Sequence, residues 1–497
     1  MTLNRPQGKW GIAILAAAVG GLAALGQAPW SLWPLSLLGF GVMFWLFSAV
    51  EAPRRAAWLG WSFGTGYFAI ALFWIVEPFL VDVGRHGWMA PFALFLMATG
   101  FALFWALALW VAQAFSRPRL KLVAGVLSLT LAELVRGVIL TGFPWATIGH
   151  VWIGHAPAQL AAFGGAGLLT FLLLAIASAP FLFSRKTLGL AAACALLGGI
   201  WGAGMLRLQS IKPELSDKIV RVIQPNAAQH LKWDPAYAQQ FLLRQLAMTE
   251  AAADTPLSAI IWPETSVTTR LDQAGIVLDA MTDAAAGVPV VFGANDLVED
   301  SYRNALAVLD AKGTIAQRYH KHHLVPFGEY VPLGELAARF GIYGMAPQHG
   351  GGFASGPGPA LIDIAVLGTA LPLICYELIF PRHLRSAERP DFILQITNDA
   401  WFGNISGPYQ HLAQAQLRAI EQGLGVVRSA NTGISAIIDP LGMVRAEAPL
   451  NRTGFFDEPL PVALAPTLYS RTGDWPITVV FVLLFMGILR APLRFGD

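Results

Sequence analysis

The feature that most constrains this chain is a series of apolar runs, each about long enough to cross a lipid bilayer. A transmembrane helix needs about 20 mostly apolar residues. The runs cover residues 10–26, 30–50, 56–76, 90–115, 120–140, 159–183 and 187–206, and a shorter one covers 475–489. Since 55% of the chain is hydrophobic and only 13% is charged, the composition excludes an ordinary soluble protein. We therefore predict a polytopic α-helical membrane protein with about eight transmembrane helices.

The positive charges between these runs predict how the helices are oriented. They gather on alternate connections, at Arg5 and Lys9, Arg54 and Arg55, Arg117, Arg119 and Lys121, Arg185 and Lys186, and Arg490 and Arg494. Cytoplasmic connections carry the excess of Lys and Arg, so both termini are predicted to be cytoplasmic. Residues 1–208 then form a bundle of about seven helices, and 475–497 form a last helix with a cytoplasmic tail. Residues 209–474 lie on the outer face, which in a Gram-negative-type cell is the periplasm.

The outer region has the sequence pattern of an α/β domain. Strands are expected at 219–224, 258–262, 289–293, 305–309, 371–374, 392–397, 425–428 and 435–438, and helices at 236–253, 271–286 and 411–422. This alternation predicts a layered domain with a central sheet. The formal net charge of only +2, with no basic stripe, argues against nucleic acid as a partner.

Three motifs in this domain carry residues suited to catalysis. They are 260–264 with Glu264, 319–332 with Lys321, and 371–377 with Cys375. Each has a plainer reading: a solvated strand end, a basic loop and a small buried hydrophobe. Together they supply a thiolate nucleophile, a carboxylate to take its proton and an ammonium to stabilise an oxyanion.

Two further groups of ionisable residues have competing readings. His320, His322 and His323 raise the alternative of a metal site, but adjacent histidines rarely bind one ion together, so no metal and no cofactor is predicted. Glu133 and Arg136 lie three apart in the fifth apolar run. They are either functional residues inside a membrane span or a pair that neutralises itself on one helix face.

The three motifs resemble the catalytic blocks of the nitrilase/amidase superfamily. They read Trp-Pro-Glu at 262–264, His-Lys-x-x-Leu-Val-Pro-Phe-Gly-Glu at 320–329 and Cys-Tyr-Glu at 375–377. Combined with the apolar runs and Asn-Asp-Ala-Trp-Phe-Gly at 398–403, they resemble the apolipoprotein N-acyltransferase family over essentially the whole chain. The resemblance implies an αββα sandwich domain.

The resemblance also implies roles for individual residues. Glu264 would be the general base, Lys321 the oxyanion stabiliser and Cys375 the nucleophile. Supporting positions near the reaction centre are implied for Glu329, Tyr376, Glu377 and Asn304, and positions on the substrate side for Trp233 and Trp401.

The implied reaction is a ping-pong acyl transfer. Cys375 would take an acyl chain from a phospholipid, with phosphatidylethanolamine as the expected donor, and hold it as a thioester. The N-terminal amine of a diacylglyceryl-cysteine on an apolipoprotein would then accept the chain as an amide. Both substrates are held in the membrane lipid by their acyl chains, and the two steps require no more than a monomer. Segments 330–346 and 349–359 are predicted to form a mobile lid.

Two other classes of function remain as alternatives. A membrane-anchored nitrilase-like amidase could use the same residues with water as the acceptor, but seven spans exceed what an anchor needs. A transporter or receptor would leave the three motifs unexplained, and the spans hold too few charged residues for an ion pathway.

Overall fold

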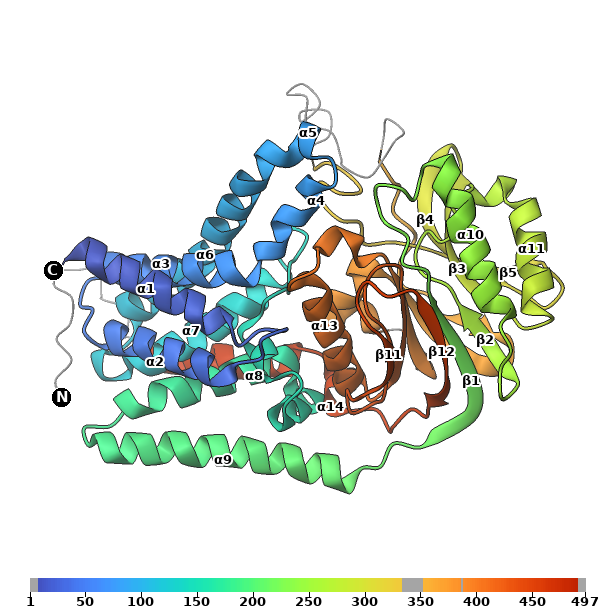
Figure 1. The fold of residues 1–497 in the computed structure, drawn as a ribbon. Coiled ribbons are helices and arrows are strands. Elements are labelled where there is room, and N and C mark those ends of the chain that lie inside the picture. Colours follow the sequence, from blue (N-terminus) through green and yellow to red (C-terminus); the bar gives the residue numbers. More distant parts are fainter. Residues whose placement is uncertain (1–7, 333–351, 386–387, 490–497) are drawn as a thin grey trace. The chain divides into compact units, whose positions relative to one another are not determined.

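The computed structural model describes residues 8–332, 352–385 and 388–489 (Figure 1). The chain divides into two compact units. The first unit comprises Met1–Lys212, Ile405–Ala413 and Pro466–Asp497, and the second comprises Pro213–Asn404 and Gln414–Ala465.

The first unit is built of helices. They are α1 (Lys9–Ala24), α2 (Trp33–Ser48), α3 (Pro53–Ala71), α4 (Glu77–Leu80), α5 (Val83–His86), α6 (Ala90–Phe115), α7 (Lys121–Arg136), α8 (Ala161–Ser178), α9 (Lys186–Ser210), α14 (Leu468–Thr472) and α15 (Trp475–Ile488). Among the described residues, three helical stretches are long and apolar enough to cross a membrane: Val83–Phe115, Ala156–Phe181 and Lys186–Ser210. Pro53–Ala71 and Phe73–Leu80, bent by 65°, make a fourth if they count as one span.

Other apolar helices are shorter than the predicted runs. Helix α2 has 16 residues and α15 has 14. At 1.5 Å per residue such helices are about 21–24 Å long, whereas the hydrocarbon core is about 30 Å thick. The apolar helices are consistent with association of this unit with a membrane, while the total of eight spans stays a prediction.

Glycines allow α1, α3 and α6 to pack with their backbones close together. A Cβ atom on Gly66 of α3 would stand 1.9 Å from the carbonyl oxygen of Ala17 in α1. One on Gly60 of α3 would stand 2.4 Å from the carbonyl oxygen of Trp105 in α6. Small residues at such contacts are typical of helix packing in membranes.

The ionisable pair of the fifth apolar run lies buried on α7. Arg136 donates from Nε to Glu133 Oε1 at 2.9 Å and from Nη2 to Oε2 at 2.7 Å. Its Nη1 donates to the carbonyl oxygens of Phe143 and Trp145 at 2.6 and 3.0 Å. The indole of Trp105 donates to Glu133 Oε1 at 2.9 Å. Of the two readings left open, this geometry is that of a self-neutralising pair, which also ties the chain after α7 back onto the helix.

The second unit contains two six-stranded sheets, ordered β12-β1-β2-β3-β4-β5 and β11-β10-β9-β8-β7-β6. Their strands are β1 (Leu215–Gln224), β2 (Leu257–Ile261), β3 (Val290–Val298), β4 (Ser301–Leu309), β5 (Ile315–His320), β6 (Ile362–Ile364), β7 (Gly368–Ile374), β8 (Phe392–Thr397), β9 (Gly425–Ala430), β10 (Ser435–Ile438), β11 (Val444–Ala448) and β12 (Gly454–Pro461). Each of the eight predicted strands is present, and β5, β6, β11 and β12 were not predicted. There are two sheets, as the αββα sandwich implied by the resemblance requires, rather than the central sheet expected from periodicity.

The layers of the second unit pack through apolar contacts. The three predicted helices correspond to α10 (Pro235–Glu250), α11 (Gly275–Ala285) and α13 (Gly407–Gln422), which belongs to this unit from Gln414 onward. Met248 of α10 and Met281 of α11 join one buried cluster with residues of β1 to β4, so both helices cover the first sheet. Between the sheets, the Ser429 hydroxyl on β9 donates to the carbonyl oxygen of Ile223 on β1 at 2.9 Å.

Parallel pairing brings several strand ends together. Strands β1, β2 and β3 are parallel in one sheet, and β7, β8 and β9 are parallel in the other. Glu264 follows β2, Cys375 follows β7 and Asn398 follows β8. Because ligands of α/β sheets bind beyond the carboxyl ends of parallel strands, these residues lie where a site is expected.

Candidate active site

Glu264 lies in a tight turn after β2, and groups from three other elements hold it. Asn304 Nδ2 on β4 donates to Oε1 at 2.7 Å, and the backbone N–H of Asn398 donates to Oε2 at 2.8 Å. Gly293 on β3 lies so close that a Cβ atom there would stand 2.7 Å from the Glu264 Cα. The carboxyl group is therefore fixed in a buried position.

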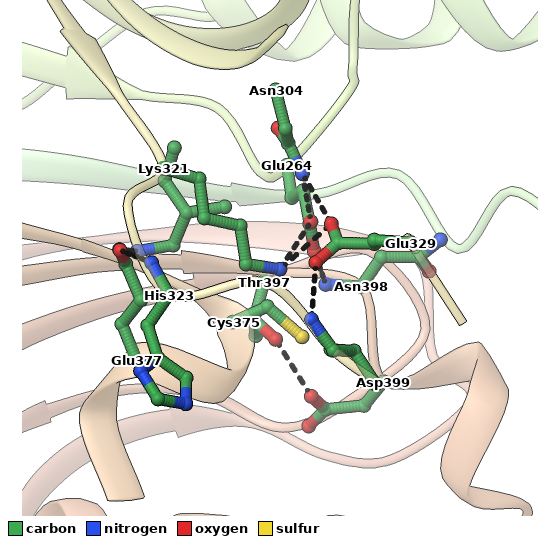
Figure 2. A network of polar contacts seen from close by, with 12 residues as sticks. Glu264, Asn304, Lys321, His323, Glu329, Cys375, Glu377, Thr397, Asn398 and Asp399 are labelled. Carbon is green, nitrogen blue, oxygen red and sulfur yellow. Dashed lines mark hydrogen bonds and ion pairs between the residues drawn. The ribbon is translucent and has the colours of Figure 1, made fainter. Parts of the chain in front are cut away.

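Lys321 follows β5 and faces two carboxylates. Its Nζ donates to Glu329 Oε1 at 2.9 Å and lies 3.9 Å from Glu264 Oε1. Asn304 Nδ2 also approaches Glu329 Oε1, at 3.3 Å, and the backbone N–H of Val325 donates to Glu329 Oε2 at 2.8 Å. Figure 2 shows the Lys321 ammonium pointing at the two carboxyl groups. One buried cation thus serves two buried acids.

Burial and the neighbouring charges together determine the protonation of Glu264 and Lys321. Burial raises the pKa of Glu264; Lys321 opposes that rise and Glu329 adds to it, and the net shift is upward. Burial acts to lower the pKa of Lys321, but the charges of Glu329, Glu264 and Cys375 outweigh it and raise that pKa. Lys321 therefore stays charged at neutral pH, and Glu264 is a stronger base than a free glutamate.

Cys375 opens the 3₁₀ helix Cys375–Ile379 directly after β7, with a φ of 54°. Non-glycine residues rarely adopt this left-handed conformation, and it is found at sites that the surrounding structure holds firmly. Burial raises the pKa of the thiol; the charge of Glu264 adds to that rise and the charge of Lys321 opposes it. A thiol with a raised pKa needs a base to take its proton as it attacks, and Figure 2 shows its sulfur on the side of Lys321 and the two acids.

Glu377 ties the second and third motifs together. Its Oε1 accepts from the backbone N–H groups of His322 and His323 at 2.8 and 3.1 Å. Its Oε2 accepts from the N–H of Ile374 at 2.8 Å and from the Tyr319 hydroxyl at 2.9 Å. Burial acts to raise the pKa of Glu377, but its contacts with His322 and Ile374 lower it. An ionised Glu377 therefore fixes the spacing between the two motifs.

The remaining predicted residues lie around this centre. Tyr376 is buried, with its ring 4.9 Å from that of Phe380. Trp233 lies in the turn before α10 and is 38% exposed, and Trp401 lies in the 3₁₀ turn Asp399–Phe402. Neither indole hydrogen-bonds to the three motif residues within the described ranges. The predicted lid falls largely outside those ranges and stays a prediction.

Two of the three histidines of the second motif have a polar side-chain partner. His320 Nε2 lies 2.9 Å from Asp296 Oδ2, and His322 Nε2 lies 3.0 Å from His383 Nδ1. Burial lowers the pKa of His323 to about 4 and that of His383 to about 2. In the part of the chain that the structure describes, no group of three or more His, Cys, Asp and Glu side chains could hold a metal ion.

Two buried polar side chains of the site were not predicted. Lys232 Nζ donates to the carbonyl oxygen of Glu264 at 3.1 Å, and burial lowers its pKa to about 8. Gln395 Nε2 donates to the carbonyl oxygen of Cys375 at 3.1 Å. The sequence signal that could have identified Lys232 is its position next to Trp233. No such signal marks Gln395, because it lies within an apolar strand and its amide bonds to a backbone carbonyl group.

Comparison with known proteins divides the chain in a similar way. Residues 19–179 match the apolipoprotein N-acyltransferase N-terminal domain, and residues 219–465 match the carbon–nitrogen hydrolase family. With its two sheets, the second unit therefore has the nitrilase-like carbon–nitrogen hydrolase fold.

Relatives extend the match to nearly the full chain. An apolipoprotein N-acyltransferase of Rhodopseudomonas palustris is 35% identical over 520 residues, covering 97% of this chain and 95% of the relative. One of Bradyrhizobium diazoefficiens is 36% identical and covers 97% of this chain and 95% of the relative. One of Caulobacter vibrioides is 36% identical and covers 98% and 96%. The chain belongs to the apolipoprotein N-acyltransferase family.

Proposed function

We propose that this protein transfers an acyl chain from a phospholipid to the N-terminal amine of a diacylglyceryl-cysteine on an apolipoprotein, by a ping-pong mechanism on Cys375. Membership of the family supports the acyltransferase activity. The observation that carries the mechanism is that three buried groups meet: Lys321 Nζ lies 3.9 Å from Glu264 Oε1, and the Cys375 sulfur lies on the same side (Figure 2).

In the first half-reaction, Glu264 takes the thiol proton as Cys375 Sγ attacks the ester carbonyl carbon of the phospholipid. The oxyanion of the tetrahedral intermediate develops beside the Lys321 ammonium, which stabilises it. Collapse of the intermediate leaves a C–S bond, breaks the ester C–O bond and releases a lysophospholipid, whose oxygen takes the proton from Glu264. The raised pKa of Glu264 suits it to both proton transfers.

In the second half-reaction, the free amine of the apolipoprotein attacks the thioester carbonyl. Glu264 takes a proton from the attacking nitrogen, the C–N bond forms and the C–S bond breaks. The proton on Glu264 then returns to the departing thiolate. The product is an amide, which is more stable than the thioester, so the transfer runs forward.

Further features of the assignment are also proposals. We infer phosphatidylethanolamine as the donor, a monomeric enzyme, and supporting roles for Glu329, Tyr376, Glu377 and Asn304, with Trp233 and Trp401 facing substrate. We also infer eight spans in a bacterial inner membrane. Residues 1–208 and 475–497 would be the membrane part, with both termini cytoplasmic, and 209–474 the periplasmic catalytic domain.

The test is the intact mass of the purified protein after incubation with phosphatidylethanolamine in mixed micelles. Cys375→Ala is compared with the wild type and with Cys194→Ala, a matched control because Cys194 is the other, exposed thiol. We expect a hydroxylamine-labile gain of one acyl group in the wild type and in Cys194→Ala, and none in Cys375→Ala. An adduct in Cys375→Ala, or none in the wild type, would contradict the proposal.

A further inference from the structure

The backbone of Cys375 needs external support. Its φ of 54° lies in the left-handed region, which is unfavourable for a residue with a Cβ atom. The Cys375 carbonyl oxygen is held in one orientation, because Gln395 Nε2 donates to it at 3.1 Å. The position of that oxygen and the direction of the side chain are coupled through the same Cα atom.

Gln395 is itself held from the neighbouring strand. It lies on β8, in register with Leu373 of β7 on one side and Arg428 of β9 on the other. The Arg428 guanidinium donates to Gln395 Oε1 through Nη1, and its Nε donates to the carbonyl oxygen of Ile434 at 3.0 Å. Gln395 and Arg428 are fully buried, so both side chains are shielded from bulk water. Because Oε1 of the amide accepts from Arg428, its N–H side faces Cys375.

The Arg428 side chain is also held in place, by the carboxylate of Asp399. Arg428 Nη2 donates to Asp399 Oδ2, and the Thr397 hydroxyl donates to Asp399 Oδ1 at 2.9 Å. A Cβ atom on Gly433 would stand 2.4 Å from Asp399 Oδ2, so the Gly433 backbone packs closely against this carboxylate. The guanidinium thus has a buried counter-charge that holds it in place.

We propose that Gln395 and Arg428 form a positioning relay beneath the nucleophile. Arg428 fixes the Gln395 amide, and Gln395 fixes the Cys375 carbonyl, which keeps the left-handed turn and the aim of the thiol. Neither side chain touches substrate. The inference rests on the proposed role of Cys375 as the acylated residue, and it extends that role to the strands that carry it.

The test compares Gln395→Met with Gln224→Met. Gln224 is a matched control because it is equally buried in the second unit and its amide also donates to backbone carbonyl oxygens, those of Pro449 and Arg452. Single-turnover acylation is measured over a range of phosphatidylethanolamine concentrations. A misaligned nucleophile loses rate rather than affinity, so we expect the saturating rate of Gln395→Met to fall by about 10- to 100-fold while KM stays near the wild-type value. Gln224→Met should keep the wild-type rate.

A second variant separates positioning from a folding defect. Gln395→Glu keeps an acceptor for Arg428 but replaces the N–H donor that faces the Cys375 carbonyl, so its acylation rate should fall as in Gln395→Met while its Tm stays higher. Wild-type acylation in Gln395→Glu, or an equal loss in Gln224→Met, would overturn the relay.

Alkylation of Cys375 by iodoacetamide gives a readout that does not depend on acyl transfer. The rate should rise in Gln395→Met, because the thiol is no longer held in place, and should stay at the wild-type value in Gln224→Met. An unchanged alkylation rate in Gln395→Met would contradict the relay. A wild type that forms no acyl adduct would instead contradict the proposed function, while the alkylation rates would still decide the relay.

Discussion

One buried ion pair from each unit can be compared, Glu133–Arg136 in the first and Glu264–Lys321 in the second. The two pairs are bonded differently. In the first unit, both Glu133 oxygens accept from the Arg136 guanidinium, at 2.9 and 2.7 Å. In the second unit, the Lys321 ammonium lies 3.9 Å from Glu264 and bonds instead to Glu329, at 2.9 Å. One pair is closed on itself, and the other shares a single cation between two acids.

The two bonding patterns distinguish a structural ion pair from a reactive one. A closed bidentate pair has little capacity left to respond to a charge that develops nearby, so its worth lies in holding the fold together. At Glu264, burial and the charge of Glu329 raise the pKa, and Lys321, which is not closed in a bidentate pair, is able to stabilise a new negative charge. Both ion pairs are buried, so their geometry rather than their burial carries the distinction.

Replacing Lys321 or Arg136 by methionine should separate the reactive role from the structural one. Of the changes considered, these two should alter rate or stability most. Lys321→Met removes the ammonium that faces the developing oxyanion, so we expect the acylation rate to fall by about 10²- to 10³-fold. Arg136→Met leaves Glu133 buried without its partner, so we expect a loss of about 3–5 kcal/mol in stability, with a near wild-type rate per folded molecule. Single-turnover kinetics and thermal unfolding in detergent measure the two effects.

The reverse pattern would contradict the comparison. If Arg136→Met lost rate while keeping its Tm, the pair in the first unit would take part in the reaction. If Lys321→Met lost Tm but kept its rate, the pair in the second unit would be structural.

A smaller effect should follow from moving Glu264 without changing its chemistry. A Cβ atom on Gly293 would collide with the backbone at Glu264, so Gly293→Ala should shift the base by a few tenths of an ångström and lower the acylation rate by about tenfold. Gly275→Ala, at the start of α11, meets nothing within 4 Å and serves as the control, with an expected rate equal to the wild type. Equal rates in both variants would mean that the position of Glu264 is not critical.

The smallest effect concerns the pH dependence. Asn304 donates to the Glu264 carboxylate and so lowers its pKa, which burial raises. Asn304→Leu should raise that pKa further. Since the base acts when deprotonated, the acid limb of the acylation rate should move to higher pH, by up to about one unit for one lost charge-assisted hydrogen bond. If the acid limb of the pH profile moved to lower pH or stayed in place, the ionisation of Glu264 would not control the acylation rate. Gln317→Leu, at a half-buried position of the edge strand β5, should leave the profile unchanged.

The predicted and the missed strands differ in their position in the sheets. The eight predicted strands are the inner four of each sheet, whereas β5, β6, β11 and β12 are the four edges. Inner strands are covered on both faces and read as continuous apolar runs, as in residues 371–374. The edge strand β5 alternates exposed and half-buried residues, and β11 does the same, so hydrophobicity alone did not reveal them.

Within the site, residue type was predictable where side-chain chemistry marks it. Glu264, Lys321 and Cys375 stand in motifs that resemble known catalytic blocks, and in the structure they follow β2, β5 and β7. The backbone N–H of Asn398 on Glu264 and the Gln395 amide on Cys375 carry no such mark. One is a backbone donor and the other bonds to a backbone acceptor, and only the register of the sheets brings them to the site.

The central claim is that the acyl group leaves Cys375 for an amine, and the most direct test is the fate of the isolated acyl-enzyme. The wild-type adduct is purified and mixed with a diacylglyceryl-cysteine peptide, with the same peptide acetylated at its N-terminus, or with buffer. We predict rapid discharge only with the free amine, with the acyl chain recovered as an amide on the peptide. Discharge at one rate in all three mixtures, with release of free fatty acid, would contradict the account and favour a hydrolase.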